Sequence, residues 1–137
     1  MKAALNKRMA EDTLNLTGFW KGVFSYPHSL PPNQFDAELR EHAGLITGET
    51  SEHGRTGQTL HGMIEGQRHG LEVGFSKLYD AMRRATTPVH YSGILSGDGT
   101  EISGTWTIPG NWSGTFLMVR AKPKAIAVER KVAETVR

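Results

Sequence analysis

The chain has 137 residues, of which 37% are hydrophobic and 22% are charged, and its formal net charge is +2. This length and balance predict one globular domain with a proper core, and so small a net charge argues against a nucleic-acid partner. Cysteine is absent, which excludes disulfides, thiolate metal sites and cysteine nucleophiles.

The first 13 residues combine basic and helix-forming residues but lack the apolar run of a signal peptide. No window of the sequence approaches the length of a membrane span. We therefore expect a cytoplasmic protein with no membrane partner, in which residues 1–13 form a tail or a short helix.

Residues 14–121 predict an all-β domain whose strands are joined by short turns. The second strand shows the clearest alternation, with Phe35, Ala37 and Leu39 on one face and polar residues between them. Proline and glycine clusters mark the breaks, among them residues 27–33 and a hairpin turn at residues 67–70. The expected strands are 17–26, 34–42, 45–52, 58–66, 71–79, 89–95, 100–108 and 112–120.

One short pattern recurs along the domain: an apolar residue, a hydroxyl residue (once His), then Gly. Because strand side chains alternate, the apolar residue and the glycine share a face each time. The occurrences are Leu16-Thr17-Gly18, Ile46-Thr47-Gly48, Leu60-His61-Gly62, Tyr91-Ser92-Gly93, Ile102-Ser103-Gly104 and Trp112-Ser113-Gly114.

Eight strands with short connections predict an antiparallel up-and-down meander that closes into a barrel, with a flatter sandwich as the alternative. Closure is favoured because it removes sheet edges. Residues 122–137 predict a C-terminal helix, since Val128, Val132 and Val136 recur every four residues.

The stretch Leu16-Thr17-Gly18-Phe19-Trp20 resembles the first-strand Gly-x-Trp signature of the calycins, the barrels that include avidins, lipocalins and fatty-acid-binding proteins. The resemblance implies that Trp20 lies inside near the closed end, with a basic residue of the last strand packed across it. Arg120, on the face that carries Phe116 and Met118, is the residue placed for this. We expect Trp20 and Arg120 to be a structural pair that closes the barrel.

The resemblance also implies a barrel that holds a small molecule, although no family ligand-binding motif is matched in the later strands. An apolar cavity would suit such a ligand. The candidate lining residues are Trp106, Tyr91, Phe116, Met118 and Phe24, and the alternative is that these rings simply fill the barrel.

Lys77 and Tyr79 share a strand face with Val73 and Phe75, so they are candidates for an inward-pointing polar anchor near the open end. Arg120 is a further candidate anchor. The alternative is that both Lys77 and Tyr79 extend to the rim and reach water.

The histidines offer no metal site, because none of the six stands at a recognised ligand spacing, and no motif predicts a cofactor. A catalytic alternative would use Glu49, His90 or Tyr79 as acid or base.

Our first hypothesis is a barrel that binds a small apolar or anionic molecule, and we expect binding rather than catalysis. A filled barrel that serves as a structural or protein-interaction module is the second hypothesis, and a small barrel enzyme is the third. Apolar residues on the outer faces of the first and last strands predict a contact surface and a homodimer. They are Phe19, Val23, Leu117 and Val119.

Overall fold

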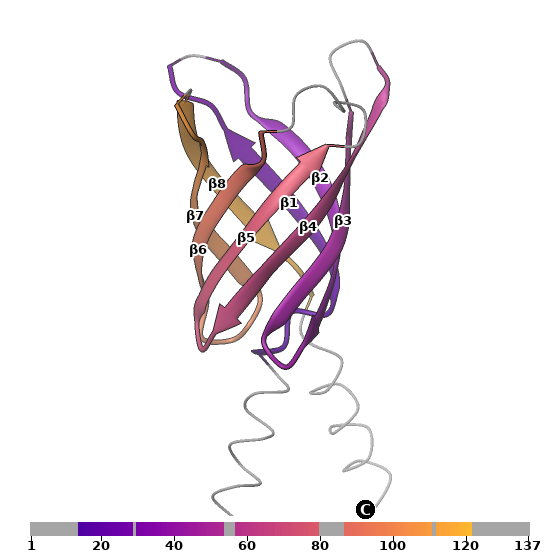
Figure 1. Ribbon diagram of the computed structural model, residues 1–137, viewed down its shortest axis with the longest axis vertical. Coiled ribbons are helices and arrows are strands. Elements are labelled where there is room, and N and C mark those ends of the chain that lie inside the picture. Colours follow the sequence, from indigo (N-terminus) through magenta and orange to yellow (C-terminus); the bar gives the residue numbers. More distant parts are fainter. Residues whose placement is uncertain (1–13, 29, 54–56, 80–86, 111, 122–137) are drawn as a thin grey trace, which may run out of the picture.

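The computed structural model describes residues 14–28, 30–53, 57–79, 87–110 and 112–121. Within these ranges the strands form a closed antiparallel barrel, in which each strand pairs with the next and β8 returns to β1 (Figure 1). The strands are β1 (Gly18–Ser25), β2 (Asn33–His42), β3 (Leu45–His53), β4 (Thr59–His69), β5 (Glu72–Tyr79), β6 (Val89–Leu95), β7 (Glu101–Ile108) and β8 (Trp112–Val119). The predicted eight-stranded up-and-down barrel is confirmed, and the sandwich alternative is wrong.

The helical segments predicted at residues 1–13 and 122–137 lie outside the described ranges. No helix within those ranges is long and apolar enough to cross a membrane.

β4 differs from its predicted bounds, because it continues through the expected turn as far as His69. Its continuation points Arg68 inward, where Nε donates a hydrogen bond to Glu41 Oε1 at 2.7 Å. The turn falls instead between His69 and Glu72, where Gly70 takes a positive φ of 61°. The hairpin turn therefore lies about two residues later than predicted: Gly70 belongs to it, whereas Gln67 and Arg68 belong to β4.

The core follows the alternation of the strands, since every strand sends one set of side chains inward. Seventeen apolar residues form a single buried cluster within the barrel. Its members are Leu16, Trp20, Phe24, Phe35, Ala37, Leu39, Ile46, Ile64, Val73, Phe75, Val89, Tyr91, Leu95, Ile102, Trp106, Phe116 and Met118.

Inward-facing glycines let the strands approach closely enough for this small barrel to close. A Cβ atom built on Gly104 would lie 2.0 Å from the carbonyl oxygen of Ser92, and one built on Gly22 would lie 2.1 Å from the Phe35 ring. The recurring apolar-hydroxyl-Gly pattern thus places a large residue and an empty position on the same inner face. Aromatic rings occupy this space at some of the glycines, as Phe116 does at Gly93 and Trp106 does at Gly114.

Gly104→Ala should lower the free energy of unfolding by about 1–3 kcal/mol, because its new methyl group meets backbone atoms that cannot move aside. The matched control is Gly74→Ala, whose Cβ would approach nothing closer than 3.9 Å. Gly74→Ala should be neutral or stabilising by up to about 1 kcal/mol, since alanine restricts the unfolded chain. Urea denaturation of both variants measures this contrast, and equal losses in the two would contradict it.

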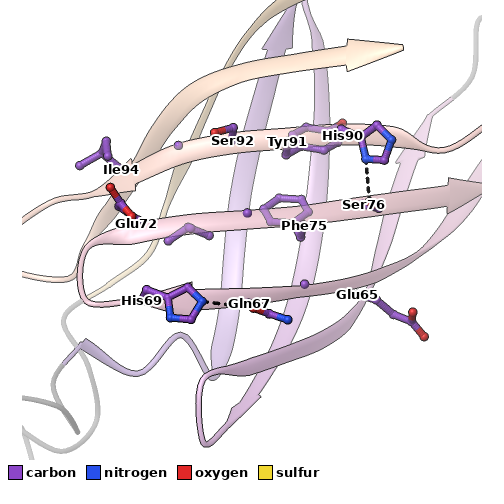
Figure 2. Close-up of a pocket in the computed structure, with 14 residues that line it drawn as sticks. Glu65, Gln67, His69, Glu72, Phe75, Ser76, His90, Tyr91, Ser92 and Ile94 are labelled. Atoms are coloured by element: carbon purple, nitrogen blue, oxygen red, sulfur yellow. Dashed lines mark hydrogen bonds between the residues drawn. The ribbon is translucent and has the colours of Figure 1, made fainter. Parts of the chain in front are cut away.

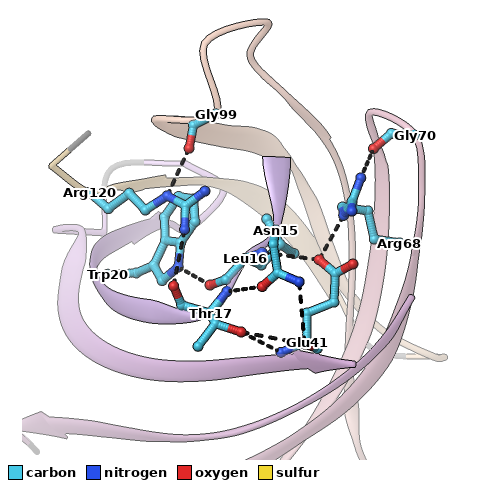
Figure 3. A network of polar contacts seen from close by, with 9 residues as sticks. All are labelled: Asn15, Leu16, Thr17, Trp20, Glu41, Arg68, Gly70, Gly99 and Arg120. Atoms are coloured by element: carbon cyan, nitrogen blue, oxygen red, sulfur yellow. Dashed lines mark hydrogen bonds and ion pairs between the residues drawn. The ribbon is translucent and has the colours of Figure 1, made fainter. Parts of the chain in front are cut away.

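One end of the barrel is closed by a polar network around Trp20 (Figure 3). Trp20 is 1% exposed, and its Nε1 donates to the carbonyl oxygen of Leu16 at 2.8 Å. The Arg120 guanidinium lies 4.4 Å from the centre of the Trp20 ring and donates to the Gly99 carbonyl oxygen at 2.8 Å. Ring and cation therefore stack at this end, where cation–π attraction is favourable.

The same end carries the ion pair between Glu41 and Arg68, whose side chains are 2% and 9% exposed. Glu41 Oε1 also accepts the backbone N–H of Leu16 at 3.0 Å. The carboxylate of Glu41, a β2 residue, thereby links the segment that precedes β1 to Arg68 of β4.

Candidate functional site

The opposite end of the barrel, where β5 ends, contains a buried lysine. Lys77 points inward and is 1% exposed. Its Nζ lies 3.8 Å from Oε1 of Glu52, a residue near the end of β3 whose side chain is 2% exposed. The alternative that Lys77 extends to the rim and reaches water is therefore wrong.

Lys77 reaches Glu52 across β4, the strand that separates β5 from β3. Gly62 is the β4 residue at this level, and it pairs with Thr50 on one side and with Tyr79 on the other. A Cβ atom built on Gly62 would lie 2.6 Å from Thr50 Oγ1 and 3.0 Å from Lys77 Cγ. The missing side chain of Gly62 thus provides the space in which the lysine stem and Thr50 meet.

Aromatic rings surround the Lys77 ammonium on several sides. Nζ lies 5.0 Å from the ring centres of Phe24 and Phe35, 4.8 Å from that of Tyr79 and 5.2 Å from that of Tyr91. Each distance is within the range of cation–π attraction. We refer to Lys77, Glu52 and these four rings as the lysine cage.

Hydrogen bonding in the lysine cage is incomplete among the described residues. Glu52 Oε2 accepts a hydrogen bond from Asn33 Nδ2 at 2.7 Å. Glu52 Oε1, Lys77 Nζ and Thr50 Oγ1 are buried and have no hydrogen-bond partner within the described ranges. Leaving buried charged groups without hydrogen bonds is costly, so the cage has unused capacity for donating and accepting them.

Burial also shifts the ionisation of the cage. It lowers the pKa of Lys77 to about 8, against the opposing effect of the Glu52 charge. Burial raises the pKa values of Tyr79 and Tyr91 above the usual tyrosine range, so both phenols stay neutral. A measurable share of neutral amine is therefore present near neutral pH beside two neutral hydroxyl groups.

Half-buried aromatic residues lie at the same end as the lysine cage. Tyr26 follows β1 and Trp112 begins β8, and their rings stack with centres 5.0 Å apart. Tyr79 and Ile108, at the ends of β5 and β7, are also partly buried against the core. We refer to Tyr26, Ile108 and Trp112 as the mouth, because they are the less buried apolar residues next to the cage.

The other candidate lining residues are buried among core side chains. Trp106 packs edge-on against Phe24, with ring centres 6.2 Å apart, and its Nε1 donates to the carbonyl oxygen of Ser25. Phe116 packs against Tyr91 at 5.0 Å, and Met118 is fully buried. The structure thus brings Lys77, Tyr79, Tyr91 and Phe24 together at the cage, whereas Trp106, Phe116 and Met118 belong to the packed interior. Arg120 lies at the opposite end, on Trp20.

Two of the candidate catalytic residues lie on the outside of the barrel. Glu49 is half exposed and forms an ion pair with Arg40 at 2.7 Å. His90 is exposed, and its Nδ1 lies 2.8 Å from the Ser76 hydroxyl. Since Tyr79 points into the barrel, the three residues do not share a cavity.

His90 belongs to an open groove on the outer face of β4, β5 and β6 (Figure 2). Gly74 faces outward and pairs with Gln67 on β4 and with Ser92 on β6. Because glycine has no side chain, nothing from Gly74 fills the centre of the groove. Glu65, His69 and Glu72 are among the residues around it. No group of three or more potential metal ligands occurs among the described residues of the chain.

The predicted outer patch lies where β1 meets β8. Val23 pairs with Leu117, and Lys21 pairs with Val119. Phe19 is 77% exposed, and Leu117 and Val119 are partly exposed. A surface pocket formed by Phe19, Lys21, Asp36 and Val119 adjoins Arg120, so the patch mixes apolar residues with a lysine–aspartate pair.

Sequence reasoning missed Glu52 as a partner of Lys77 and Glu41 as a partner of Arg68. Alternation could have indicated both, since Glu52 shares a face with Ile46 and Glu41 shares one with Leu39. No sequence signal indicates that β3 and β5, which are not neighbours, meet through Gly62.

Fold and site together define a small closed β-barrel with a buried lysine–glutamate pair at one end. No protein-family model matches the chain, and no curated protein sequence matches it. Among solved structures, one described as a redesigned β-barrel is similar, with a TM-score of 0.67, covering 84% of this chain and 96% of that chain at 14% sequence identity. This likeness shows the fold alone and does not place the chain among the calycins.

Proposed function

We propose that the protein binds a small, partly apolar molecule through a carboxylate or carbonyl group that accepts hydrogen bonds from Lys77. The observation that carries the proposal is the buried Lys77 ammonium, which lacks a hydrogen-bond partner among the described residues. The calycin resemblance of the first strand agrees with it, since it too implies a ligand held in the barrel.

The distances in the cage support an acceptor ligand. The separation of 3.8 Å between Lys77 Nζ and Glu52 Oε1 exceeds a hydrogen-bond length, so the ammonium keeps its donors available. A ligand oxygen beside Nζ would satisfy a buried charge. Hydrogen bonds to charged groups contribute more than neutral ones, about 1.5–3 kcal/mol each.

The mouth supports an apolar part next to the acceptor group. Tyr26 and Trp112 present partly buried rings next to the cage, and flat rings suit an aromatic or conjugated ligand. A ligand that enters there would displace these side chains and reach Lys77 without disturbing the Trp20 end.

Benzoate tests the proposal, with benzyl alcohol as an uncharged comparison of similar size. We expect saturable tryptophan quenching by benzoate, because Trp106 packs on Phe24 beside Lys77 and Trp112 packs on Trp106. Lys77→Met should weaken benzoate binding by about tenfold to a hundredfold, the equivalent of one charged hydrogen bond. Circular dichroism checks that the variant is folded.

The matched control is Lys21→Met, which removes an exposed lysine on the outer face and should leave binding unchanged. Equal affinity of wild type and Lys77→Met for benzoate would overturn the proposal, as would the absence of saturable quenching.

A filled barrel that acts as an interaction module is the second candidate function. Its support is the high exposure of Phe19 on the outer patch together with the contacts among Trp106, Phe24, Tyr91 and Phe116 inside. Association of two copies through this patch would form the homodimer expected from the sequence. Absence of ligand binding, with dimers in sedimentation, would favour this function over the first.

A further inference from the structure

The amine of Lys77 carries a charge when protonated and is a nucleophile when neutral. Its surroundings differ from those of the other described lysine. Lys21 lies on the outer face, 83% exposed, and pairs with Asp36 at 3.2 Å. Lys77 is enclosed by four rings, with a carboxylate oxygen at 3.8 Å and no hydrogen-bond partner among the described residues. An amine desolvated in an apolar pocket is the usual setting for covalent chemistry with carbonyl compounds.

We propose that Lys77 forms a reversible imine with aromatic or conjugated aldehydes that enter past Tyr79. The inference rests on the proposed function, because it assigns a ligand class to the same site and adds a covalent step. It is carried by three features of the cage: a buried primary amine, an adjacent carboxylate and a lining of aromatic rings.

The step needs only the groups that the cage holds. The lone pair of the neutral Lys77 Nζ attacks the aldehyde carbon, the carbonyl π electrons move to oxygen, and one of the two Nζ protons is transferred to that oxygen to give a neutral carbinolamine. A proton then leaves nitrogen, the hydroxyl group leaves as water, and the C=N bond forms. Amine plus aldehyde gives imine plus water, with no oxidant or reductant. Glu52 Oε1 lies 3.8 Å from Nζ, so it accepts the proton from Nζ and returns it to the departing hydroxyl group once it closes to hydrogen-bond distance or acts through one water.

The environment favours this product in two ways. Burial lowers the pKa of Lys77 to about 8, which increases the share of neutral amine near neutral pH. Enclosure by rings keeps water away from the imine, whose hydrolysis would otherwise reverse the reaction. The rings also match the flat apolar part of an aromatic aldehyde.

Benzaldehyde with sodium cyanoborohydride tests the inference on the full chain, because reduction turns an imine into a stable secondary amine. We expect the benzyl adduct on Lys77 to exceed that on Lys21 in the peptide map. Labelling at Lys77 should be at least about tenfold greater than at Lys21, since each pKa unit changes the neutral fraction about tenfold. Excess benzoate should block labelling at Lys77 and leave labelling at Lys21 unchanged.

Lys77→Arg separates the covalent step from simple binding, because arginine keeps the charge and cannot form this imine. The variant should retain benzoate binding and lose the site-specific adduct. If wild type binds benzoate but Lys77 is labelled no more than Lys21, the imine inference is wrong and the proposed function stands. If benzoate neither binds nor protects Lys77, both fail. Because Lys21 serves as an internal reference in wild type, the test remains decisive even if Lys77→Arg does not fold.

Discussion

Glu41→Gln should lower the free energy of unfolding by about 3–5 kcal/mol, the usual cost of breaking a buried ion pair by removing one partner. The substitution keeps an oxygen that can accept from the Leu16 backbone but removes the charge opposite Arg68. A guanidinium does not shed its proton in proteins, so the buried positive charge of Arg68 cannot neutralise itself. Urea denaturation at neutral pH measures the loss.

The matched control for this effect is Glu49→Gln, because the Arg40–Glu49 pair has the same 2.7 Å contact on the exposed outer face. Exposed pairs contribute between about 0 and 1 kcal/mol, so this variant should unfold much like wild type. If Glu41→Gln cost no more than Glu49→Gln, the closed-end network would not be a main source of stability.

Stability should rise by about 3 kcal/mol between about pH 8 and pH 10.5 through Lys77 alone. Its folded-state pKa, about 8, lies below the ordinary value of 10.5 because the side chain is buried. In this window the unfolded chain binds more protons than the folded chain, so raising the pH favours folding. Below about pH 8 both states carry the proton, and the cost of burying the charge is present in full.

Denaturation at about pH 7.5 and at about pH 9.5 checks this expectation, with a rise of about 2 kcal/mol over that interval. Lys77→Met is the reference, because it removes the titrating amine and retains the tyrosines, which begin to ionise in the unfolded chain near pH 10. Over this pH interval the free energy of unfolding should rise more for the wild-type protein than for Lys77→Met. Parallel pH profiles would show that Lys77 titrates as an exposed lysine.

Much of the fold could be predicted because the β periodicity is local. Alternation in strands such as β2 and β6 shows directly which residues face inward, and the turn residues mark the strand ends. The error at Arg68 arose where polar composition and burial conflict. An inward arginine looks like a turn residue until its partner, Glu41, two strands away, is known.

The candidate site was only partly predictable for a related reason. The shared face of Val73, Phe75 and Lys77 indicates an inward lysine. Its burial depends on Glu52, which lies on a strand that is not a neighbour of β5, and on the space left by Gly62. Such contacts follow from barrel closure and strand stagger, which the residues of one strand do not encode.

NMR of selectively labelled lysine side chains, recorded while benzoate is added, tests the central claim most directly. If the ligand accepts hydrogen bonds from Lys77, the Lys77 Cε resonance should shift saturably and its pKa should rise from about 8, because the added negative charge favours the ammonium. The Lys21 resonance should stay in place. A Lys77 resonance that does not move at any benzoate concentration would contradict a binding site at the cage.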